Sequence, residues 1–382
     1  MNVIYIGSNG FPNGLATIQR QILIAKGLIQ NGVMCRVITR FGIRNDKSIQ
    51  RKGVYDGLVP YICAAPIPYR PKNVFKRNIN KILGNVNELI LIRKYKKKNQ
   101  VNVLLGIRSS IIRTFYYRMI SILFGFKYII DVNELLGIEG DDQGNMNHLL
   151  FNKYSSKLCD GMILISDYLI RHYKKKKNNL KYVKIPIICD VKGITSINPI
   201  VKDDNFLLYC SSISYKESIM FVINSFLKVE GCVKLKLIIS GSEHEIQKVE
   251  QYISLCSKSH LVSIESDIPY NKLISYYKKA KGLLIPLPET IQHKARFPHK
   301  IGEYTSSKSP IISNKWGELS NYFDNTSAYL AEKYDEVEFA RLMEECTNSD
   351  NADIIKNAYK IALDNFDYNI VSKDIVHLIE EV

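Results

Sequence analysis

Residues 296–310, which read R-F-P-H-K-I-G-E-Y-T-S-S-K-S-P, combine cationic, carboxylate and hydroxyl side chains in one short segment. A helix opened by residues 297–298 has its proline in the first turn, where a missing N–H costs nothing, and residues 308–310 end it before an apolar strand. Lys300 and Glu303 are three residues apart, so they lie on one face of this helix. Because the helix follows a strand, its free backbone N–H groups are available to an anion. We therefore expect the segment to hold a phosphate and a sugar hydroxyl together.

A glycine-rich segment follows the first predicted strand. Residues 7–17 read G-S-N-G-F-P-N-G-L-A-T and lead into a long amphipathic helix. The glycines lack the G-x-G-x-x-G spacing, and no acid follows a second strand to hold a ribose, so a nicotinamide cofactor is not indicated. Gly14 and Leu15 are candidates for lining a ligand site, because glycine permits close approach of the backbone to a ligand. Simple turn formation explains the glycines equally well.

The sequence gives no reason to expect a metal or a bound cofactor. The seven histidines form no ligand pair at helical spacing, and Asp141-Asp142 lacks D-x-D spacing. The eight cysteines include no C-x-x-C pair and mostly accompany apolar strand and helix patterns. We interpret them as reduced core residues, so neither a zinc site nor a disulfide framework is supported.

Predicted strands and helices alternate along the whole chain. Short β-rich runs are expected at residues 3–7, 33–39, 101–106, 128–131, 161–166, 182–186, 206–210, 235–240, 261–265, 282–287, 311–313 and 328–330, with helical patterns between them. Strict alternation implies parallel sheets with right-handed crossovers. We predict an α/β fold with two doubly wound Rossmann-like domains whose parallel sheets face an interdomain cleft. Ligands in such folds bind beyond the carboxyl ends of strands, so candidate sites should directly follow strands.

The length and composition suit two domains. The chain has 382 residues with 46% hydrophobic and 24% charged content, enough for two separate cores. Residues 1–190 form the predicted N-terminal domain and residues 205–366 the C-terminal domain. Residues 191–204 are polar without clear periodicity and are the predicted linker.

The net charge of +16 is unevenly distributed. Residues 1–190 contain 31 Lys and Arg against 11 Asp and Glu, or +20, and the remainder contains 22 against 26, or −4. Solvated helix ends explain this as well as an anion-binding surface does. For such a surface an anionic membrane leaflet is favoured, because a polybasic patch gains about 1 kcal/mol per cation there. No nucleic-acid motif is present, so nucleic acid is not an expected partner.

The expected location follows from the ends and the hydropathy of the chain. The N-terminus begins directly with a strand and has no cationic leader, and the longest apolar runs are far short of a membrane span. We expect a cytoplasmic protein that binds peripherally to the inner face of the cytoplasmic membrane.

Several motifs occur in the order seen in retaining glycosyltransferases of the GT-B fold, family four. They are the glycine-rich first loop, D-V-N-E at residues 131–134, I-L-I-S-D-Y-L at 163–169, I-S-Y-K-E at 213–217 and F-P-H-K-I-G-E-Y at 297–304. The last motif, followed by S-P-I-I, resembles the F-P-x-K-x-x-E-Y element of bacterial polysaccharide members. The resemblance spans nearly the whole chain. It implies transfer of a sugar from a nucleotide-sugar, which is a substrate and not a cofactor, to a lipid-linked oligosaccharide or to a cell-surface polysaccharide such as capsule or O-antigen.

The resemblance implies that the C-terminal domain binds the donor. Glu303 corresponds to the second glutamate of the family's E-x7-E motif, which binds the ribose hydroxyls, and a carboxylate can accept two hydrogen bonds from a vicinal diol. Lys216 matches the lysine that neutralises the donor diphosphate; its alternative is a solvated lysine at a helix N-terminus, where the helix dipole slightly disfavours it. The alternative for Lys300 is an intrahelical pair with Glu303, worth about 0.3 kcal/mol. The other donor-binding candidates are Ser240, Gly241, Arg296, Phe297, Pro298, His299 and Lys300.

The same resemblance implies that the N-terminal domain binds a glycan or polyprenyl-linked acceptor. Asn133 and Glu134 follow a strand, and Glu134 is the predicted catalytic carboxylate that orients the acceptor, with helix or loop capping as an equal alternative. Gly14 and Leu15 complete the acceptor candidates. Residues 367–382 resemble the family's final helix, which crosses back to the N-terminal domain.

Three positions depart from the family pattern. The first glutamate of E-x7-E would fall at Ala295, an arginine that often accompanies the lysine would fall near Ser212, and the histidine of D-x-H-E is Asn133. These departures leave open a catalytically inactive paralogue that binds nucleotide or glycan, or another GT-B enzyme such as a nucleotide-sugar epimerase. Retention without a placed protein nucleophile is consistent with front-face attack, which requires no general base. Because D-x-D spacing and histidine ligand pairs are lacking, we expect a metal-independent reaction.

Overall fold

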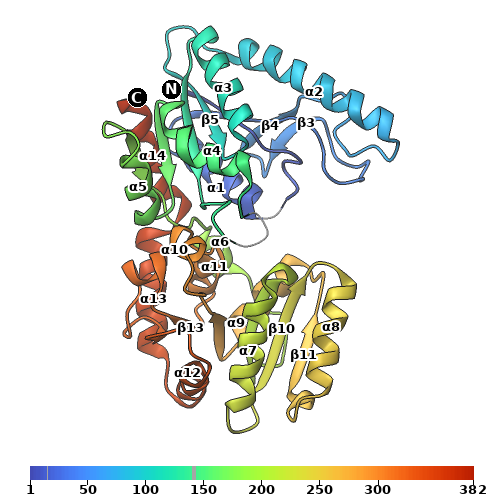
Figure 1. Cartoon of the computed structure of the whole chain (residues 1–382), viewed down its shortest axis with the longest axis vertical. Coiled ribbons are helices and arrows are strands. Elements are labelled where there is room, and N and C mark those ends of the chain that lie inside the picture. The colour runs from blue at the N-terminus through green and yellow to red at the C-terminus, as the bar shows by residue number, and fades with distance from the viewer. Residues whose placement is uncertain (15, 140–142) are drawn as a thin grey trace. The chain divides into compact units, whose positions relative to one another are not determined.

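The computed structural model describes residues 1–14, 16–139 and 143–382, and divides them into two compact units. The first unit comprises Met1–Cys189 and Asp367–Val382, and the second comprises Asp190–Phe366 (Figure 1). Each unit has a sheet of its own with helices on both faces. The predicted α/β fold with two parallel-sheet domains is therefore confirmed. Leu15 and Asp141-Asp142 lie outside the described residues.

The first unit contains an eight-stranded sheet in the order β3-β4-β2-β1-β5-β6-β7-β8. Neighbouring strands are parallel except for the β3–β4 pair at one edge. The order reverses beside β1, as in other doubly wound sheets. The strands are β1 (Asn2–Ile6), β2 (Met34–Thr39), β3 (Lys52–Tyr55), β4 (Val59–Cys63), β5 (Asn102–Ile107), β6 (Lys127–Val132), β7 (Gly161–Leu164) and β8 (Lys181–Lys184).

The antiparallel β3–β4 hairpin corrects the prediction of strict βαβ alternation. Asp56 and Gly57 both have positive φ angles, 51° and 64°, and the Leu58 amide donates to the Tyr55 carbonyl across the turn at 3.0 Å. This is the backbone of a two-residue hairpin turn, for which Asp-Gly is a favoured dipeptide. The Asp-Gly dipeptide at residues 56–57 is therefore the local sequence signal of this hairpin.

The helices of the first unit are α1 (Ala16–Gln30), α2 (Val74–Tyr95), α3 (Ile111–Phe124), α4 (Met146–Tyr154), α5 (Asp167–Lys174) and α14 (Tyr368–Glu381). Although α14 is the last element of the chain, it packs on α1 and β8. A Cβ on Gly27 of α1 would lie 2.0 Å from the Ser372 hydroxyl oxygen of α14, so only glycine permits this approach. In Figure 1 the red α14 lies among the blue and green elements of the first unit.

A buried ion pair joins α1 to the end of β6. The Arg20 guanidinium donates to both carboxylate oxygens of Asp131, at 2.9 and 3.1 Å, and both side chains are only 1% exposed. The remaining donors reach the carbonyls of Pro186 at 2.7 Å and Ile185 at 3.2 Å, just beyond β8. Bidentate geometry and additional acceptors are what a buried arginine requires. This pair therefore holds α1, β6 and the segment after β8 together.

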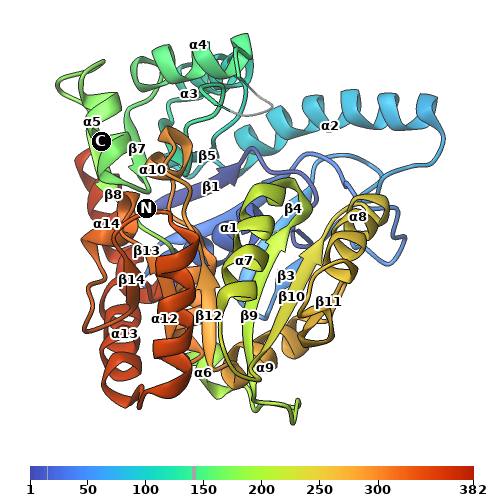
Figure 2. The same cartoon turned by 60° about the horizontal axis from the view of Figure 1, so that its bottom comes forward.

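The second unit contains a fully parallel six-stranded sheet in the order β11-β10-β9-β12-β13-β14. Its strands are β9 (Phe206–Ser212), β10 (Lys234–Ser240), β11 (Val262–Glu265), β12 (Gly282–Ile285), β13 (Ile311–Asn314) and β14 (Tyr329–Ala331). Its helices are α6 (Val191–Ser196), α7 (Lys216–Lys228), α8 (Glu243–Ser254), α9 (Tyr270–Lys279), α10 (Ile291–Ala295), α11 (Lys300–Ser306), α12 (Glu336–Asn348) and α13 (Ala352–Asn365). Figure 2 shows α7 beside β9 and α8 beside β11. The strand order reverses between β9 and β12, which makes their carboxyl ends the expected ligand edge.

Residues 191–204, predicted as a linker, belong to the second unit and begin with α6. Asp190 caps α6 by accepting from the Gly193 amide at 2.8 Å. The chain that follows is fixed to α9, because the Ile200 amide donates to the Ser275 hydroxyl at 2.6 Å. Six helical residues are too few to show a 3.6-residue period, which explains why the segment looked irregular. Within the described ranges, no helix is long and apolar enough to cross a membrane.

Replacing Asp131 by alanine should lower the free energy of unfolding by about 3–5 kcal/mol, because it leaves the buried Arg20 without its carboxylate. Urea denaturation of the full chain measures this. Asp56→Ala is the control, since it removes the exposed partner of Lys26 and should cost about 1 kcal/mol or less. Equal losses in the two variants would contradict the structural role of the buried pair.

Candidate functional site

The segment that follows β12 contains two short helices where one was predicted. The first, α10, was not predicted, and α11 begins at Lys300, two residues after the proline at position 298. Arg296 and the two residues after it form an extended connection between the helices. Pro298 and His299 are half-buried in this connection, and the Pro298 carbonyl accepts the first hydrogen bond of α11 from the Ile301 amide at 3.1 Å.

The ring of Phe297 belongs to the core of the second unit. Phe297 is 2% exposed, stacks on Tyr322 at 5.5 Å between ring centroids, and meets the edge of Phe366 at 5.8 Å. These contacts anchor the connection between α10 and α11. Only the backbone of Phe297 can therefore face a ligand, although the residue was predicted to bind the donor.

Glu303 lies on α11 and receives a hydrogen bond from another element. The hydroxyl of Tyr270, the first residue of α9, donates to Glu303 Oε1 at 3.2 Å. Burial raises the pKa of the Glu303 carboxyl above its ordinary value, while the Tyr270 hydrogen bond and the charge of Lys300 oppose that rise. Its second oxygen and remaining lone pairs make this carboxylate suitable for accepting hydrogen bonds from a diol.

Lys300 does not form an ion pair with Glu303. Its ammonium group donates to the carbonyl of Cys210 in β9. The bond runs from α11, which follows β12, to the neighbouring strand. Lys300 therefore fixes the first turn of α11 against the sheet and keeps two further N–H donors for a ligand.

Arg296 is held by two aromatic residues. Its guanidinium lies over the ring of Tyr215 at 4.7 Å from the centroid and donates to the Tyr215 hydroxyl at 2.7 Å. On its other side it contacts His293 Nε2 at 2.5 Å, and His293 Nδ1 lies 2.9 Å from the Thr290 hydroxyl. Because arginine can only donate, His293 Nε2 must accept, which assigns the ring proton to Nδ1. The arrangement holds a cation beside the start of α7.

Lys216, the first residue of α7, directly follows Tyr215 and is exposed. Together with the larger influence of Lys248, its charge helps to lower the pKa of Glu245 at the start of α8. Within the described residues the structure gives Lys216 no hydrogen bond or ion pair. It is therefore a cation available at the carboxyl edge of the sheet, close to the position of Arg296.

Ser240 and Gly241 lie at the end of β10, next to the end of β9. Both are exposed, and Gly241 has a φ of 139°, which favours glycine. A Cβ at Gly241 would lie 2.4 Å from Ile213 Cγ2, so glycine lets this loop approach the segment after β9. The hydroxyl of Ser212, which occupies the expected arginine position, accepts from the Ser214 amide at 3.3 Å.

Ala295 ends α10 and is fully buried. A glutamate at this position would point into the second unit and would need a rearrangement to reach a ligand. Glu289 is another carboxylate in the segment after β12, and its Oε1 accepts from the Tyr334 amide at 3.1 Å. Position 295 therefore supports packing in this protein.

The acceptor candidates lie in the first unit. Asn133 and Glu134 follow β6 and are half-buried, and Asn133 Oδ1 is buried without a hydrogen-bond partner in the described structure. Gly14 is half-buried, and a Cβ there would lie 2.3 Å from Ile18 Cγ1. Leu15 is outside the described residues. Over the ranges 1–14, 16–139 and 143–382, no group of three or more His, Cys, Asp or Glu side chains is placed to hold a metal ion.

Two helices of the first unit expose apolar side chains on the faces opposite their buried faces. On α2 the buried residues Asn80, Gly84, Glu88 and Ile92 recur every four positions. The hydroxyl of Tyr117 on α3 donates to Glu88 of α2 at 2.9 Å, so the two helices meet at this point. The exposed apolar residues, named here the α2–α3 surface, are Phe75, Ile79, Ile82, Leu83, Val86, Ile90, Ile112, Phe115, Met119, Ile122 and Leu123. Exposed apolar residues that gather on one face of a helix are typical of an interaction site.

Sequence reasoning missed three residues of this site. Tyr270, Tyr215 and His293 were not singled out, although each follows a strand of the second sheet at its carboxyl edge. The rule that ligands bind beyond strand ends pointed to these segments. It could not indicate which side chains meet.

The chain resembles known glycosyltransferases. Residues 191–361, just under half of the chain, match the family model described as Glycosyl transferases group 1. Sucrose-phosphate synthase from Thermosynechococcus elongatus has a TM-score of 0.72 at 14% identity, with coverage of 100% of this chain and 98% of that chain. HepE from Anabaena, solved with UDP and glucose, has a TM-score of 0.72 at 13% identity and 100% coverage of both chains. A glycosyltransferase from Rickettsia africae has a TM-score of 0.70 at 14% identity, covering 100% of this chain and 97% of that chain.

These structural similarities, at low identity, establish the fold. Two α/β domains with parallel sheets are the architecture of these GT-B glycosyltransferases, which confirms the predicted fold class. A comparison with curated protein sequences found no match. The family match places Lys216, Arg296 and Glu303 inside the region that resembles glycosyl transferases.

Tyr270→Phe should raise the pKa of Glu303 further, because it removes a donor that favours the ionised carboxylate. Titration of the carboxyl carbon by NMR, with labelled glutamate, measures the shift. Lys272→Met is the control, since Lys272 is on the same helix but pairs with Glu265 at 2.8 Å. A Glu303 pKa that stays constant or falls in Tyr270→Phe would show that the hydrogen bond has no electrostatic role.

Proposed function

We propose that this protein is a retaining glycosyltransferase that transfers a sugar from a nucleotide-sugar to a lipid-linked oligosaccharide or a polysaccharide precursor. The main support is the convergence of Glu303, Arg296 and Lys216 at the carboxyl edge of the second sheet, within the matched family region. A carboxylate beside cations at a strand-order reversal suits a ligand with both hydroxyl and diphosphate groups. Metal chelation or cofactor removal should leave the reaction unchanged.

The donor is proposed to bind through its nucleotide. Glu303 accepts hydrogen bonds from the ribose hydroxyls, and its raised pKa means that the ionised form is lost at a higher pH than for an ordinary glutamate. Lys216 and Arg296 neutralise the diphosphate. Arg296 is already oriented by Tyr215 and His293, so little side-chain entropy is lost on binding. A UDP-sugar is the first donor to test, because Anabaena HepE was solved with UDP and glucose.

The proposed chemistry is front-face substitution. The acceptor hydroxyl attacks the anomeric carbon on the side of the departing nucleoside diphosphate, and a donor phosphate oxygen takes its proton. As the glycosidic bond breaks, negative charge grows on the diphosphate, where Lys216 and Arg296 stabilise it. Glu134 in the first unit is proposed to orient the acceptor hydroxyl.

The α2–α3 surface supports peripheral binding to an anionic membrane. Its apolar side chains face away from the sheet, and cationic residues of α2 flank them, including Lys76 and Lys94. An exposed apolar helix face with flanking cations is the pattern of interfacial helices. The excess positive charge of residues 1–190 is complementary to anionic lipid. Such a location suits a lipid-linked acceptor.

Donor hydrolysis tests the catalytic proposal. In a panel of nucleotide-sugars, Glu303→Gln and Lys216→Ala should each lower kcat/KM by at least about tenfold, since each removes a charged contact to the donor. Glu345→Gln and Lys228→Ala are controls; Lys228 is also on α7 but pairs with Glu336 at 2.8 Å. If Glu303→Gln and Lys216→Ala leave the rate unchanged, the proposal fails. Tight nucleotide binding without turnover would favour an inactive paralogue, and a sugar that stays nucleotide-bound would favour an epimerase.

Vesicle sedimentation tests the membrane proposal. The double variant Ile82→Glu and Val86→Glu should reduce binding to phosphatidylglycerol vesicles by about tenfold or more, because each new charge near the surface opposes binding by about 1 kcal/mol and apolar contact is lost. Leu255→Glu is the control, since Leu255 is 87% exposed on the second unit. Wild-type protein that stays in the supernatant would refute membrane binding by this surface.

A further inference from the structure

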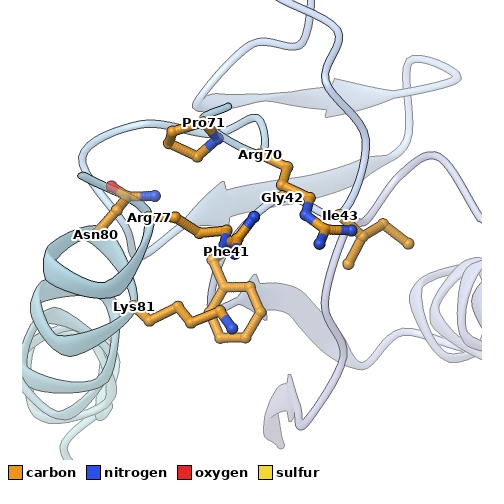
Figure 3. A pocket seen from close by; sticks show the side chains of 8 residues that line it. All are labelled: Phe41, Gly42, Ile43, Arg70, Pro71, Arg77, Asn80 and Lys81. Carbon is orange, nitrogen blue, oxygen red and sulfur yellow. The ribbon is translucent and has the colours of Figure 1, made fainter. Parts of the chain in front are cut away.

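The first unit contains a cavity of about 220 Å³ that none of the site residues above lines. Phe41 forms one wall just beyond the carboxyl end of β2, and its carbonyl accepts from the Gly10 amide at 2.9 Å. Pro71 and Asn80 also line the cavity (Figure 3). Ligand pockets usually measure about 300–1,000 Å³. The cavity therefore suits a single chemical group better than a whole nucleotide-sugar.

Three cationic side chains line this cavity. Figure 3 shows Arg70, from the loop before α2, and Arg77 and Lys81, from α2, extending toward the same space. The sequence between Asp56 and Glu88 contains five Lys and Arg residues and no Asp or Glu. Lys81 lies over the ring of Phe41 at 5.5 Å, and in the described parts of the chain none of the three cations has a carboxylate partner. The cavity is therefore positively charged and uncompensated.

The walls of the cavity are already fixed. Asn80 is 4% exposed, and its amide accepts from the Ile67 N–H at 2.9 Å and donates to the Ile67 carbonyl at 2.8 Å. This ties the loop that carries Arg70 to α2. A Cβ on Gly42 would lie 1.9 Å from the Pro68 carbonyl oxygen, so glycine permits the segment after β2 to touch the same loop. A ligand therefore binds without the cost of ordering a mobile loop.

We infer that this cavity binds a phosphoryl group of a phosphate or diphosphate ester. Guanidinium groups match phosphate oxygens with paired hydrogen bonds, and an ammonium group adds a point charge. An anion of charge near −2 relieves the repulsion among three neighbouring cations. The assignment of this phosphoryl group to the acceptor substrate rests on the proposed function. The binding of a phosphoryl group in the cavity does not depend on it. The phosphate belongs either to a polyprenyl lipid, because Phe75 and Ile79 begin the exposed apolar face at the same turns of α2, or to a soluble hexose phosphate.

Calorimetric titration with inorganic pyrophosphate tests the cavity directly. The full chain carries Lys216→Ala and Arg296→Gln, so that the donor-site cations of the second unit do not contribute. In this background Arg77→Gln should weaken pyrophosphate binding by about tenfold or more, because a charge-assisted contact is lost. Lys76→Gln is the matched control, since it removes the same charge from a neighbouring residue that does not line the cavity. Lys81→Gln replaces Arg77→Gln if melting shows that the latter is unfolded.

Equal weakening by Arg77→Gln and Lys76→Gln, or the lack of saturable pyrophosphate binding, would overturn the inference. Two further arms identify the source of the phosphate. One adds hexose 6-phosphate as a competitor, and the other compares phosphatidylcholine vesicles that contain polyprenyl phosphate with vesicles that contain phosphatidylglycerol. Dependence on Arg77 in either ester arm supports an acceptor phosphate, and binding of neither ester overturns that assignment. No arm measures turnover, so failure of the proposed transferase reaction would leave this result standing.

Discussion

The proposed donor site depends on the parallel direction of the strands in the second sheet. Parallel strands bring their carboxyl ends to one edge, so the segments after β9, β10, β11 and β12 converge although they are far apart in sequence. The direction of the strands does not by itself fix the position of a side chain, however. One hydrogen bond fixes the helix that carries Glu303. The Lys300 ammonium on α11 donates to the Cys210 carbonyl in β9, which joins the helix after one central strand to its neighbour. Glu303 is one turn further along α11, so its position relative to β9 follows from this bond. Tyr270 then reaches it from the segment after β11.

In the first unit, a buried cation has its acceptors within the protein, whereas three surface-accessible cations have no carboxylate partner in the described residues. Arg20 is almost fully buried, and its guanidinium donates to both oxygens of Asp131 and to two backbone carbonyls. The charge of Arg20 is thus balanced within the protein, and the ion pair stabilises the fold. Arg70, Arg77 and Lys81 surround a small cavity without a carboxylate, in a stretch of sequence that contains none. Arg70 and Lys81 are exposed and Arg77 is half-buried, so a ligand that enters the cavity can reach all three cations. The same distinction applies in the second unit. Lys300 has an acceptor within the protein, whereas Lys216 remains available to a ligand.

Most of the architecture could be predicted because apolar periodicity is a local property of the sequence. The strand expected at residues 128–131 spans Lys127–Val132 in the structure, and the strand expected at residues 235–240 spans Lys234–Ser240. Short elements were missed: α6 and α10 have too few residues to show a period, and the β3–β4 hairpin was signalled only by the dipeptide at residues 56–57. The pairings that build the sites could not be predicted. Nothing in the pattern indicates that Tyr270 meets Glu303 or that Arg20 meets Asp131, because these contacts depend on how helices dock on the sheets.

The departure at Ala295 has a structural reason that changes its meaning. A missing glutamate would suggest a defective site if the position faced the ligand, but here α10 turns residue 295 into the core. The same turn of chain directs the next residue, Arg296, outward onto the ring of Tyr215, where His293 accepts from its guanidinium. A proton on His293 Nε2 would remove that acceptor and place two cations together, so the geometry requires the neutral ring. The segment that lacks the acidic contact thus provides an oriented cation, Arg296, beside Lys216. Ser212, at the expected arginine position, provides no cation there. Loss of the carboxylate and gain of the arginine are two results of one local conformation, and in the proposed donor complex they shift the interactions of this edge from the sugar toward the diphosphate.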